Sequence, residues 1–369
     1  MASKLILKSY NVGTGELTDQ WSEDVTGVPK MIRTTRENPP SKFAIATDMG
    51  EVFVCKHSGE KIYRVDLGYN PTDLDINEIG RLAVWDGTNK KLEVYDENGE
   101  LKKTLTTGTT PALPHANWVA IGYKGDKVWL TADDFGARSP DVMRIDFTDL
   151  LNPSIDWQRN ISVPTDYTIR AFCVSRNGKQ GMFVLSGGTE AVILVEVIAG
   201  RISPPEYVGG YWVSDAGAYV SHFSGNVGFE ERANLYNERS AALDNTLIAI
   251  VARNGVIYVI REDGTVGAIS THSRYSDVDL NYNGLKLVQS NGDTLEYYTC
   301  VDTAKLIYEL SWYKTLANED VPVLMTDDAN YVLVVDGDTV KVFDSMGTQK
   351  YSYATLWSKK PTPFIREYT

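Results

Sequence analysis

Residues 74–84 read Leu-Asp-Ile-Asn-Glu-Ile-Gly-Arg-Leu-Ala-Val, and residues 278–288 read Val-Asp-Leu-Asn-Tyr-Asn-Gly-Leu-Lys-Leu-Val. Each stretch consists of an apolar run, a polar residue, a turn that contains glycine, and a second apolar run. Glycine and asparagine tolerate the positive φ that tight hairpin turns require, so each stretch predicts a β-hairpin. Looser copies of the same pattern occupy residues 119–130, 172–185 and 323–335.

A second hairpin follows most of these copies, so the repeating unit has four strands. Internal repetition at roughly 40 to 60 residues with four strands per unit is typical of a β-propeller. The sequence therefore predicts an all-β chain that forms a β-propeller of seven four-stranded blades, with eight blades as the alternative. The predicted blades span residues 29–68, 69–109, 110–162, 163–210, 211–271, 272–312 and 313–357.

Two blades contain less regular stretches. In the fourth, residues 192–203 read as the second hairpin, with a turn near Ala199-Gly200. In the fifth, residues 229–242 interrupt the strand pattern and predict a short helix or an ordered loop.

The two ends of the chain lie outside the seven predicted blades. Within residues 1–28, the stretch from Leu5 to Trp21 reads as a hairpin with no first hairpin before it. It is either a closure element of the ring or an accessory hairpin against its outside. Residues 358–369 form a C-terminal tail, and pairing of residues 362–368 with the N-terminal hairpin would give an incomplete eighth blade.

The charge balance limits the classes of partner. The formal net charge is −13, and the pI is near 4.9. Nonspecific nucleic-acid binding needs a basic surface, so no nucleic-acid partner is expected. Attraction to anionic membranes is disfavoured for the same reason.

Neither a secretory signal nor a membrane-spanning segment is predicted. The apolar stretch at the N-terminus is interrupted by Lys8, whereas a secretory signal needs about 7 to 15 apolar residues. No run approaches the roughly 18 apolar residues of a transmembrane helix. The composition, rich in tyrosine, tryptophan and glycine, resembles that of exposed β proteins. We therefore expect a cytoplasmic location or a place in a virus particle.

No catalytic motif and no cofactor site is predicted. The three cysteines are far apart and include no CxxC pair, which disfavours a zinc or redox site. The acid pairs Asp73/Asp75 and Asp277/Asp279 are spaced loosely like calcium ligands, but they lack the glycine and the final glutamate of an EF-hand loop. We expect them on innermost strands in a structural role; a calcium ion there is unsupported.

The repeats resemble the broad β-propeller group of the WD-repeat or YVTN-like kind, over nearly the whole chain. The resemblance implies the fold and no particular function. The dipeptide Trp85-Asp86 occurs once, after the second strand of its blade rather than at the end of the third. The double glycines Gly187-Gly188 and Gly209-Gly210 are too few to indicate a kelch-type propeller.

Two features suggest an interaction surface. Aromatic residues gather near the start of the fifth predicted blade, and exposed aromatic side chains anchor protein interfaces or stack on sugars. The insertion at 229–242 adds charged residues on a rigid ring, where loops often contact partners. The candidate interaction residues are Tyr207, Tyr211, Trp212, Phe229, Glu231, Arg232, Tyr236 and Arg239.

These observations favour a non-enzymatic structural or protein-interaction module, in its particular form a virion component of the capsid, tail or attachment apparatus. One alternative is a glycan-binding propeller. Another is a metal-dependent propeller hydrolase with its site at the channel mouth, where His115 and His272 are candidates.

Overall fold

The computed structural model describes the chain as strands joined by turns, with no helix among the described residues. Between residues 168 and 258 only the backbone is described. None of the described segments is a helix long and apolar enough to span a bilayer. The structure describes residues 3–354, except 12–13, 36–40, 110–112, 114–115, 123–125, 133–141, 160–167, 175–179, 188–189, 198–205, 209–210, 214–218, 225–232, 237–247, 254–255, 262–265, 271–275, 282–283, 320, 322 and 327.

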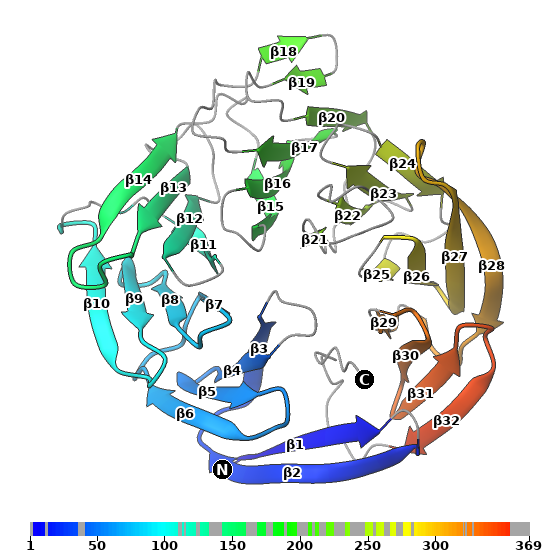
Figure 1. Ribbon diagram of the computed structural model, residues 1–369, viewed down its shortest axis with the longest axis horizontal. Helices are drawn as coiled ribbons and strands as arrows, with labels where there is room; N and C mark the ends of the chain where they lie inside the picture. Colours follow the sequence, from blue (N-terminus) through cyan, green and yellow to red (C-terminus); the bar gives the residue numbers. More distant parts are fainter. Residues whose placement is uncertain are drawn as a thin grey trace. The chain divides into compact units, whose positions relative to one another are not determined.

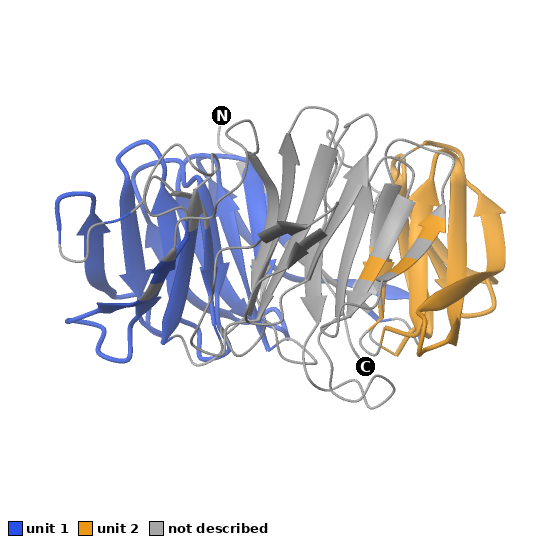
Figure 2. Cartoon of the chain, turned by 90° about the horizontal axis from the view of Figure 1, so that it is seen from above, with its two compact units in different colours: residues 1–169, 176–181, 198–205 blue, residues 170–175, 182–197, 206–369 orange. Residues whose placement is uncertain are grey.

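The described strands form one two-stranded, six four-stranded and one six-stranded sheet, all antiparallel where the register is defined (Figure 1). The chain divides into two compact units, which are coloured separately in Figure 2. Unit 1 comprises Met1–Ile169, Arg176–Gly181 and Ile198–Pro205, and unit 2 comprises the rest.

Unit 1 contains the two-stranded sheet β1–β2 and three four-stranded sheets in which consecutive strands pair. Its strands are β1 (Ser3–Asn11), β2 (Glu16–Val25), β3 (Pro29–Thr34), β4 (Lys42–Thr47), β5 (Glu51–Lys56), β6 (Lys61–Asp66), β7 (Asp73–Ile76), β8 (Leu82–Asp86), β9 (Lys91–Tyr95), β10 (Leu101–Thr106), β11 (Ala116–Ile121), β12 (Lys127–Ala132), β13 (Val142–Asp146) and β14 (Ser154–Arg159).

Unit 2 contains three four-stranded sheets and most residues of the six-stranded sheet. The strands that follow β14 are β15 (Thr168–Val174), β16 (Gln180–Gly187), β17 (Glu190–Val197), β18 (Glu206–Val208), β19 (Tyr211–Val213), β20 (Tyr219–Ser224), β21 (Ala233–Tyr236), β22 (Ile248–Arg253), β23 (Val256–Arg261), β24 (Val266–Ser270), β25 (Ser276–Leu280), β26 (Lys286–Asn291), β27 (Thr294–Asp302), β28 (Ile307–Thr315), β29 (Val323–Met325), β30 (Tyr331–Asp336), β31 (Thr339–Asp344) and β32 (Gln349–Ala354).

Neighbouring sheets of a unit pack face to face through their central strands. In β8, Leu82 and Val84 belong to a core shared with the sheet β3–β6, whereas Ala83 and Trp85 face the sheet β11–β14. Side chains alternate between the two faces of a strand, and both faces of β8 are buried. This explains why β8 reads as a continuous apolar run rather than as an alternating one.

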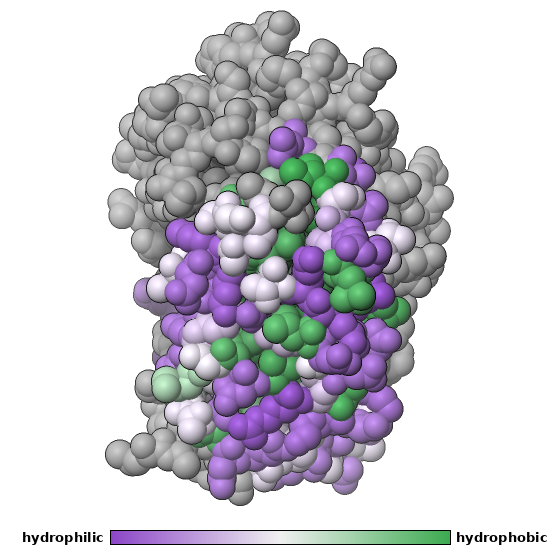
Figure 3. Space-filling view, turned by 90° about the vertical axis from the view of Figure 1, so that its left-hand side faces the viewer, coloured by the Kyte–Doolittle hydropathy of each residue, from purple (hydrophilic) through white to green (hydrophobic). Residues whose placement is uncertain are grey.

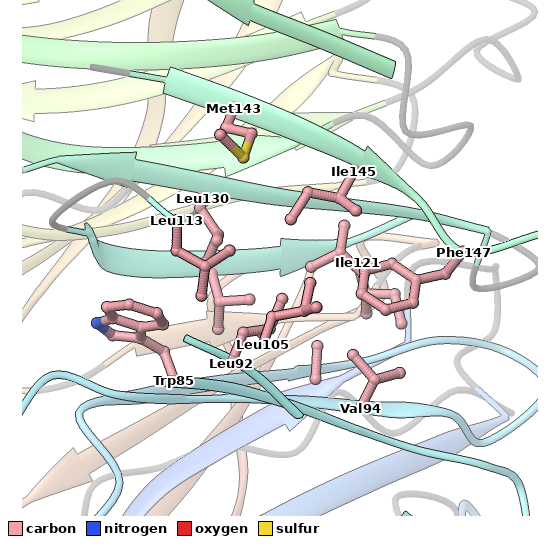
Figure 4. Packing of buried hydrophobic residues seen from close by; sticks show 13 residues of the cluster. Trp85, Leu92, Val94, Leu105, Leu113, Ile121, Leu130, Met143, Ile145 and Phe147 are labelled. Carbon is pink, nitrogen blue, oxygen red and sulfur yellow. The ribbon is translucent and has the colours of Figure 1, made fainter. Parts of the chain in front are cut away.

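The core between the sheets β7–β10 and β11–β14 shows how this packing works (Figure 4). Leu92, Val94 and Leu105 meet Ile121, Leu130 and Ile145, and all six side chains are fully buried. A comparable cluster joins the sheets β25–β28 and β29–β32 in unit 2. Each sheet therefore depends on its neighbour to remove its apolar face from water.

The six-stranded sheet differs from the hairpin expected at residues 192–203. Its strand order is β15-β16-β17-β20-β19-β18, so the partner of β17 is β20. The hairpin β18–β19 pairs with β20 on its other side. Within residues 229–242, where a helix or a loop was expected, the described part is strand β21. An additional hairpin thus extends this sheet beyond its fourth strand.

The hairpin β1–β2 lies against the sheet β3–β6 within unit 1. The rings of Trp21 and Phe53 are 5.9 Å apart, and Glu23 of β2 forms ion pairs with Lys61 and Arg64 of β6. Phe53 and Cys55 lie in the same strand, β5, and both are fully buried. The C-terminal tail lies outside the described residues, so an eighth blade stays a prediction.

Candidate functional site

Two acidic side chains of β7 act as hydrogen-bond acceptors for the next sheet. β7 is the last strand of the order β10-β9-β8-β7, and Asp73 and Asp75 are buried there. Asp73 Oδ2 accepts a hydrogen bond from the Val119 backbone N–H at 2.9 Å, and Asp75 Oδ2 accepts one from Ile121 at 2.8 Å. Val119 and Ile121 belong to β11, the first strand of its own sheet.

The same contact recurs in unit 2. Asp279 of β25 is buried, and its Oδ2 accepts a hydrogen bond from the Met325 backbone N–H of β29 at 2.9 Å. Donor and acceptor are 46 residues apart, as they are for Asp73 and Asp75. The recurrence at one spacing identifies this bond as part of the repeat.

Asp73 also forms an ion pair with an arginine of the preceding sheet. Arg33 of β3 donates to Asp73 Oδ1 at 2.8 Å. Burial raises the pKa of Asp73, and the nearby Arg33 and the Val119 N–H partly offset that effect. Both carboxylate oxygens are therefore committed to protein partners.

These contacts support the structural role expected for the acids. In the described part of the chain, no group of three or more histidine, cysteine and acidic residues is placed to hold a metal ion. The side chain of Asp277 lies outside the described residues. Asp73, Asp75 and Asp279 instead pair backbone N–H groups that would otherwise be buried without an acceptor.

A second polar cluster surrounds Glu93 on β9. Tyr69 and Tyr95 donate hydrogen bonds to Glu93 Oε2 at 2.6 and 2.9 Å, and Lys91 donates to Oε1 at 2.8 Å. The Lys91 ammonium also lies 4.0 Å from the centre of the Tyr69 ring. Burial and Glu93 raise the pKa of both tyrosines, so the phenols stay protonated and donate. Glu93, Lys91, Tyr69 and Tyr95 thus all have polar partners within the cluster.

Glu296 repeats part of this cluster in unit 2. Tyr298 donates a hydrogen bond to Glu296 Oε2 at 2.8 Å, and Gln289 donates to the same carboxylate. The motif Leu-Glu-x-Tyr accounts for both sites, at residues 92–95 and 295–298. The repeat of this motif is therefore a signal in the sequence from which both clusters could be predicted.

Only some of the predicted interaction residues fall on described strands. Tyr207 and Trp212 are register partners across the hairpin β18–β19, and Tyr211 pairs with Val208. Tyr236 is the last residue of β21, in another sheet. The remaining candidates, Phe229, Glu231, Arg232 and Arg239, lie outside the described residues. The backbone thus brings Tyr207, Tyr211 and Trp212 together on one hairpin.

Among the four histidines, His57 is the one whose side chain is described. His57 follows β5 and donates its backbone N–H to the Ser41 carbonyl. Burial lowers the pKa of its imidazole. His115 and His272 lie outside the described residues, and for His222 of β20 only the backbone is described.

Figure 3 shows how exposed hydrophobic residues are distributed on one face of the molecule. On the face shown in Figure 3, hydrophobic residues form small patches among hydrophilic ones. Leu101, Leu151 and Ile155 are among the large hydrophobic residues exposed in this unit. Isolated exposed residues of this kind are ordinary on protein surfaces.

An aromatic residue on the outer strand of one sheet covers a turn of the next sheet in each unit. The Tyr63 hydroxyl of β6 donates to the Gly80 carbonyl at 2.7 Å, and its ring lies against Gly99. Trp312 of β28 donates to the Ser345 carbonyl at 3.0 Å, and its ring lies against Gly347. The glycines at these turns are visible in the sequence, but the contacts between the sheets are not.

Comparison with known proteins identifies the fold. No protein-family model matches the chain, and no curated protein is similar to it in sequence. The dihydro-heme d1 dehydrogenase NirN matches with a TM-score of 0.64 and 11% identity, over 95% of this chain and 73% of that one. Apo AztD from Citrobacter koseri matches with a TM-score of 0.59 and 11% identity, over 95% and 92% of the chains. Both are β-propeller proteins, and the chain has the β-propeller fold.

Proposed function

We propose that this protein is a non-enzymatic β-propeller that serves as a protein-interaction module through the hairpin β18–β19. The observation that carries the proposal is that this hairpin is appended to β20, outside a set of strands that is already four long. A four-stranded sheet needs no such extension, because the other described sheets apart from β1–β2 end at the fourth strand.

The composition of the hairpin fits a contact surface. Tyr207, Tyr211 and Trp212 fall within six residues, and tyrosine and tryptophan are enriched at protein interfaces. The register sets Tyr207 opposite Trp212. Cross-strand neighbours lie about 5 Å apart, so the pair can act as one anchor. Sugars also stack on aromatic rings, which makes a glycan the second candidate ligand.

The finer architecture and setting belong to the same proposal. Each sheet of four or more strands is one blade of a seven-bladed propeller, and β1–β2 is accessory to it. In its particular form, the protein is a component of a virus particle and uses the hairpin within the capsid, tail or attachment apparatus. The motivation for this form is the exposed-type composition, rich in tyrosine, tryptophan and glycine.

The test compares three full-length proteins in the source cells or particles: the wild type, Tyr207→Ala/Trp212→Ala, and Tyr351→Ala/Tyr353→Ala. The last is a matched control, because Tyr351 and Tyr353 are a stacked aromatic pair on β32 with ring centroids 6.5 Å apart. We expect a defined set of co-purifying proteins to be lost from the hairpin variant alone.

Other outcomes separate the alternatives. Equal recovery of these proteins with all three forms would refute the hairpin as the contact. Binding of the wild type, but not of the hairpin variant, to a glycan array would replace the protein partner with a sugar. Fractionation that finds the protein only as a free monomer would exclude the virion form.

A further inference from the structure

The outer strand β28 differs from the outer strands of the other four-stranded sheets. It has 9 residues, whereas β6, β10, β14 and β32 have 6 each and β24 has 5. β28 is the last strand of the sheet β25–β28 (Figure 1), and β27 is its hydrogen-bonded neighbour among the described strands. No described strand pairs with the other edge of β28, so its backbone N–H and C=O groups are available to a further strand.

The edge of β28 exposes apolar side chains. Exposed edges are normally guarded by lysines, by bulges or by being short. β28 has a bulge and one lysine, Lys314, and the pairing proposed below would neutralise that lysine. In β28, Leu310 is 48% exposed and Tyr313 is 64% exposed. Such an edge is a template for another strand.

The charges of β28 are self-complementary. Glu309 and Lys314 have no ion-pair partner in the described part of the chain. In an antiparallel pairing of two β28 strands, the register that sets Glu309 opposite Lys314 of the second copy also sets Leu310 opposite Tyr313. By two-fold symmetry each pair occurs twice, so two ion pairs flank two apolar pairs.

A β-bulge makes this register possible. Tyr298 pairs with Leu310 and Tyr297 pairs with Trp312, so Ser311 is an extra residue in β28. Leu310 and Tyr313 then lie on one face of the sheet, because their partners Tyr298 and Glu296 are two residues apart. Without the bulge, strict alternation would put Leu310 and Tyr313 on opposite faces.

The opposite face agrees with this arrangement. Glu309 and Lys314 pair with Thr299 and Leu295, which are four residues apart and share a face. The Ser311 hydroxyl lies 2.7 Å from that of Thr299, so the extra residue points to that face as well. Both members of every proposed cross-strand pair therefore lie on the same side of the joined sheet.

We propose that β28 pairs antiparallel with β28 of a second copy of this chain, about a two-fold axis between Ser311 and Trp312. The contact is isologous and closes at a dimer. One pair of edge strands buries less than the roughly 1,200 Å² of a standard interface, so the dimer is weak and concentration-dependent.

The test is sedimentation of the full-length protein over a range of concentrations, with charge variants at the two positions. Glu309→Lys and Lys314→Glu each turn two attractive pairs into two repulsive ones. The association constant of the dimer should therefore fall by roughly tenfold or more in each variant. An equimolar mixture should regain association, because every pair in the heterodimer again joins a lysine to a glutamate. The double variant Glu309→Lys/Lys314→Glu should also dimerise.

The control is Glu319→Lys, an exposed residue in the segment after β28 that changes net charge by the same amount. It should leave the equilibrium as in the wild type. A wild type that stays monomeric at every concentration would overturn the proposal. So would a dimer that Glu309→Lys leaves intact, or a mixture that associates no better than its components. Recovery in the mixture also shows that the single variants are folded.

Discussion

Asp75 Oδ2 accepts a hydrogen bond from the Ile121 backbone N–H, 2.8 Å away and 46 residues along the chain, in the neighbouring sheet. Ile121 belongs to β11, whose far edge has no strand partner among the described residues. The aspartate therefore supplies the acceptor that another strand would have provided. Asp279 does the same for Met325 in unit 2. In both units, a carboxylate oxygen accepts a backbone hydrogen bond that a neighbouring strand would otherwise accept.

Replacing Asp75 with alanine should lower the free energy of unfolding by about 1–3 kcal/mol, because the buried N–H of Ile121 loses its acceptor. Asp75→Asn should cost less, since the amide oxygen can still accept. Urea unfolding followed by fluorescence measures both. Glu97→Ala, which removes an exposed acid between β9 and β10, is the control. An Asp75→Ala protein as stable as this control would show that the bond contributes nothing.

The fold was predictable because each hairpin has a local signal in the sequence, two strand patterns joined by a turn that contains glycine. Leu82 to Trp85 and Leu92 to Tyr95 show strand patterns, and Gly80 and Gly99 occupy turns with φ values of 96° and 81°. The strand pairing at β17–β20 was not predictable in the same way. Gly209-Gly210 stands between the residues of β18 and β19 and is itself a hairpin-turn signal, whereas the predicted boundary between the fourth and fifth blades, after residue 210, separates the two strands of this hairpin.

The polar contacts were harder to predict than the strands. Period-two alternation shows that Asp73 and Asp75 share a face, yet it says nothing about which backbone group the neighbouring sheet presents to them. The same holds for Trp312 of β28 and Gly347, which meet because the turn between β31 and β32 comes against that strand. A single sequence therefore indicates the sheets and leaves the bonds between them open.

Gly347 should be intolerant of alanine. Its φ is +76°, and a Cβ there would lie 2.8 Å from the Trp312 ring. Gly292 has a φ of +56° with no atom within 4 Å of such a Cβ, so Gly292→Ala bears only the conformational cost of about 1–2 kcal/mol. We expect Gly347→Ala to be more destabilising than Gly292→Ala in thermal unfolding. Equal losses would mean that the Trp312 contact adjusts without cost.

The hairpin β1–β2 should protect Cys55 from thiol reagents. Cys55 is fully buried, and burial raises the pKa of its thiol to about 12, although Lys61 acts in the opposite direction. In a Cys173→Ser/Cys300→Ser background, labelling of the remaining thiol at neutral pH should be slow. Deleting residues 1–25 should speed it by roughly tenfold or more, the equivalent of about 1.4 kcal/mol of lost protection.

Glu23→Lys provides a milder form of the same experiment, because it places a cation against Lys61 and Arg64. Labelling of Cys55 should then be intermediate between that of the intact and the deleted protein. If the thiol of the truncated protein labels as slowly as that of the intact one, the hairpin is not what covers it.

Asp336 should give the stability of unit 2 a defined pH dependence. Its carboxylate accepts hydrogen bonds from the backbone N–H groups of Ala317 and Asn318, each at 2.9 Å, and pairs with Lys341. Burial alone would raise the pKa of Asp336, but these partners outweigh burial and hold the pKa below its ordinary 3.8. A carboxylate whose folded pKa is depressed stabilises the fold above the unfolded pKa, and that stabilisation is lost as the pH falls through the folded value.

Asp336→Asn should therefore be less stable than the wild type by about 1–3 kcal/mol near neutral pH, because it loses the charge that its three partners favour. The difference should shrink as the pH falls below about 4, where the wild-type carboxylate also becomes protonated. Urea unfolding of both proteins at a series of pH values measures it. A difference that stays constant from neutral to acidic pH would show that Asp336 holds the segment after β28 by shape rather than by charge.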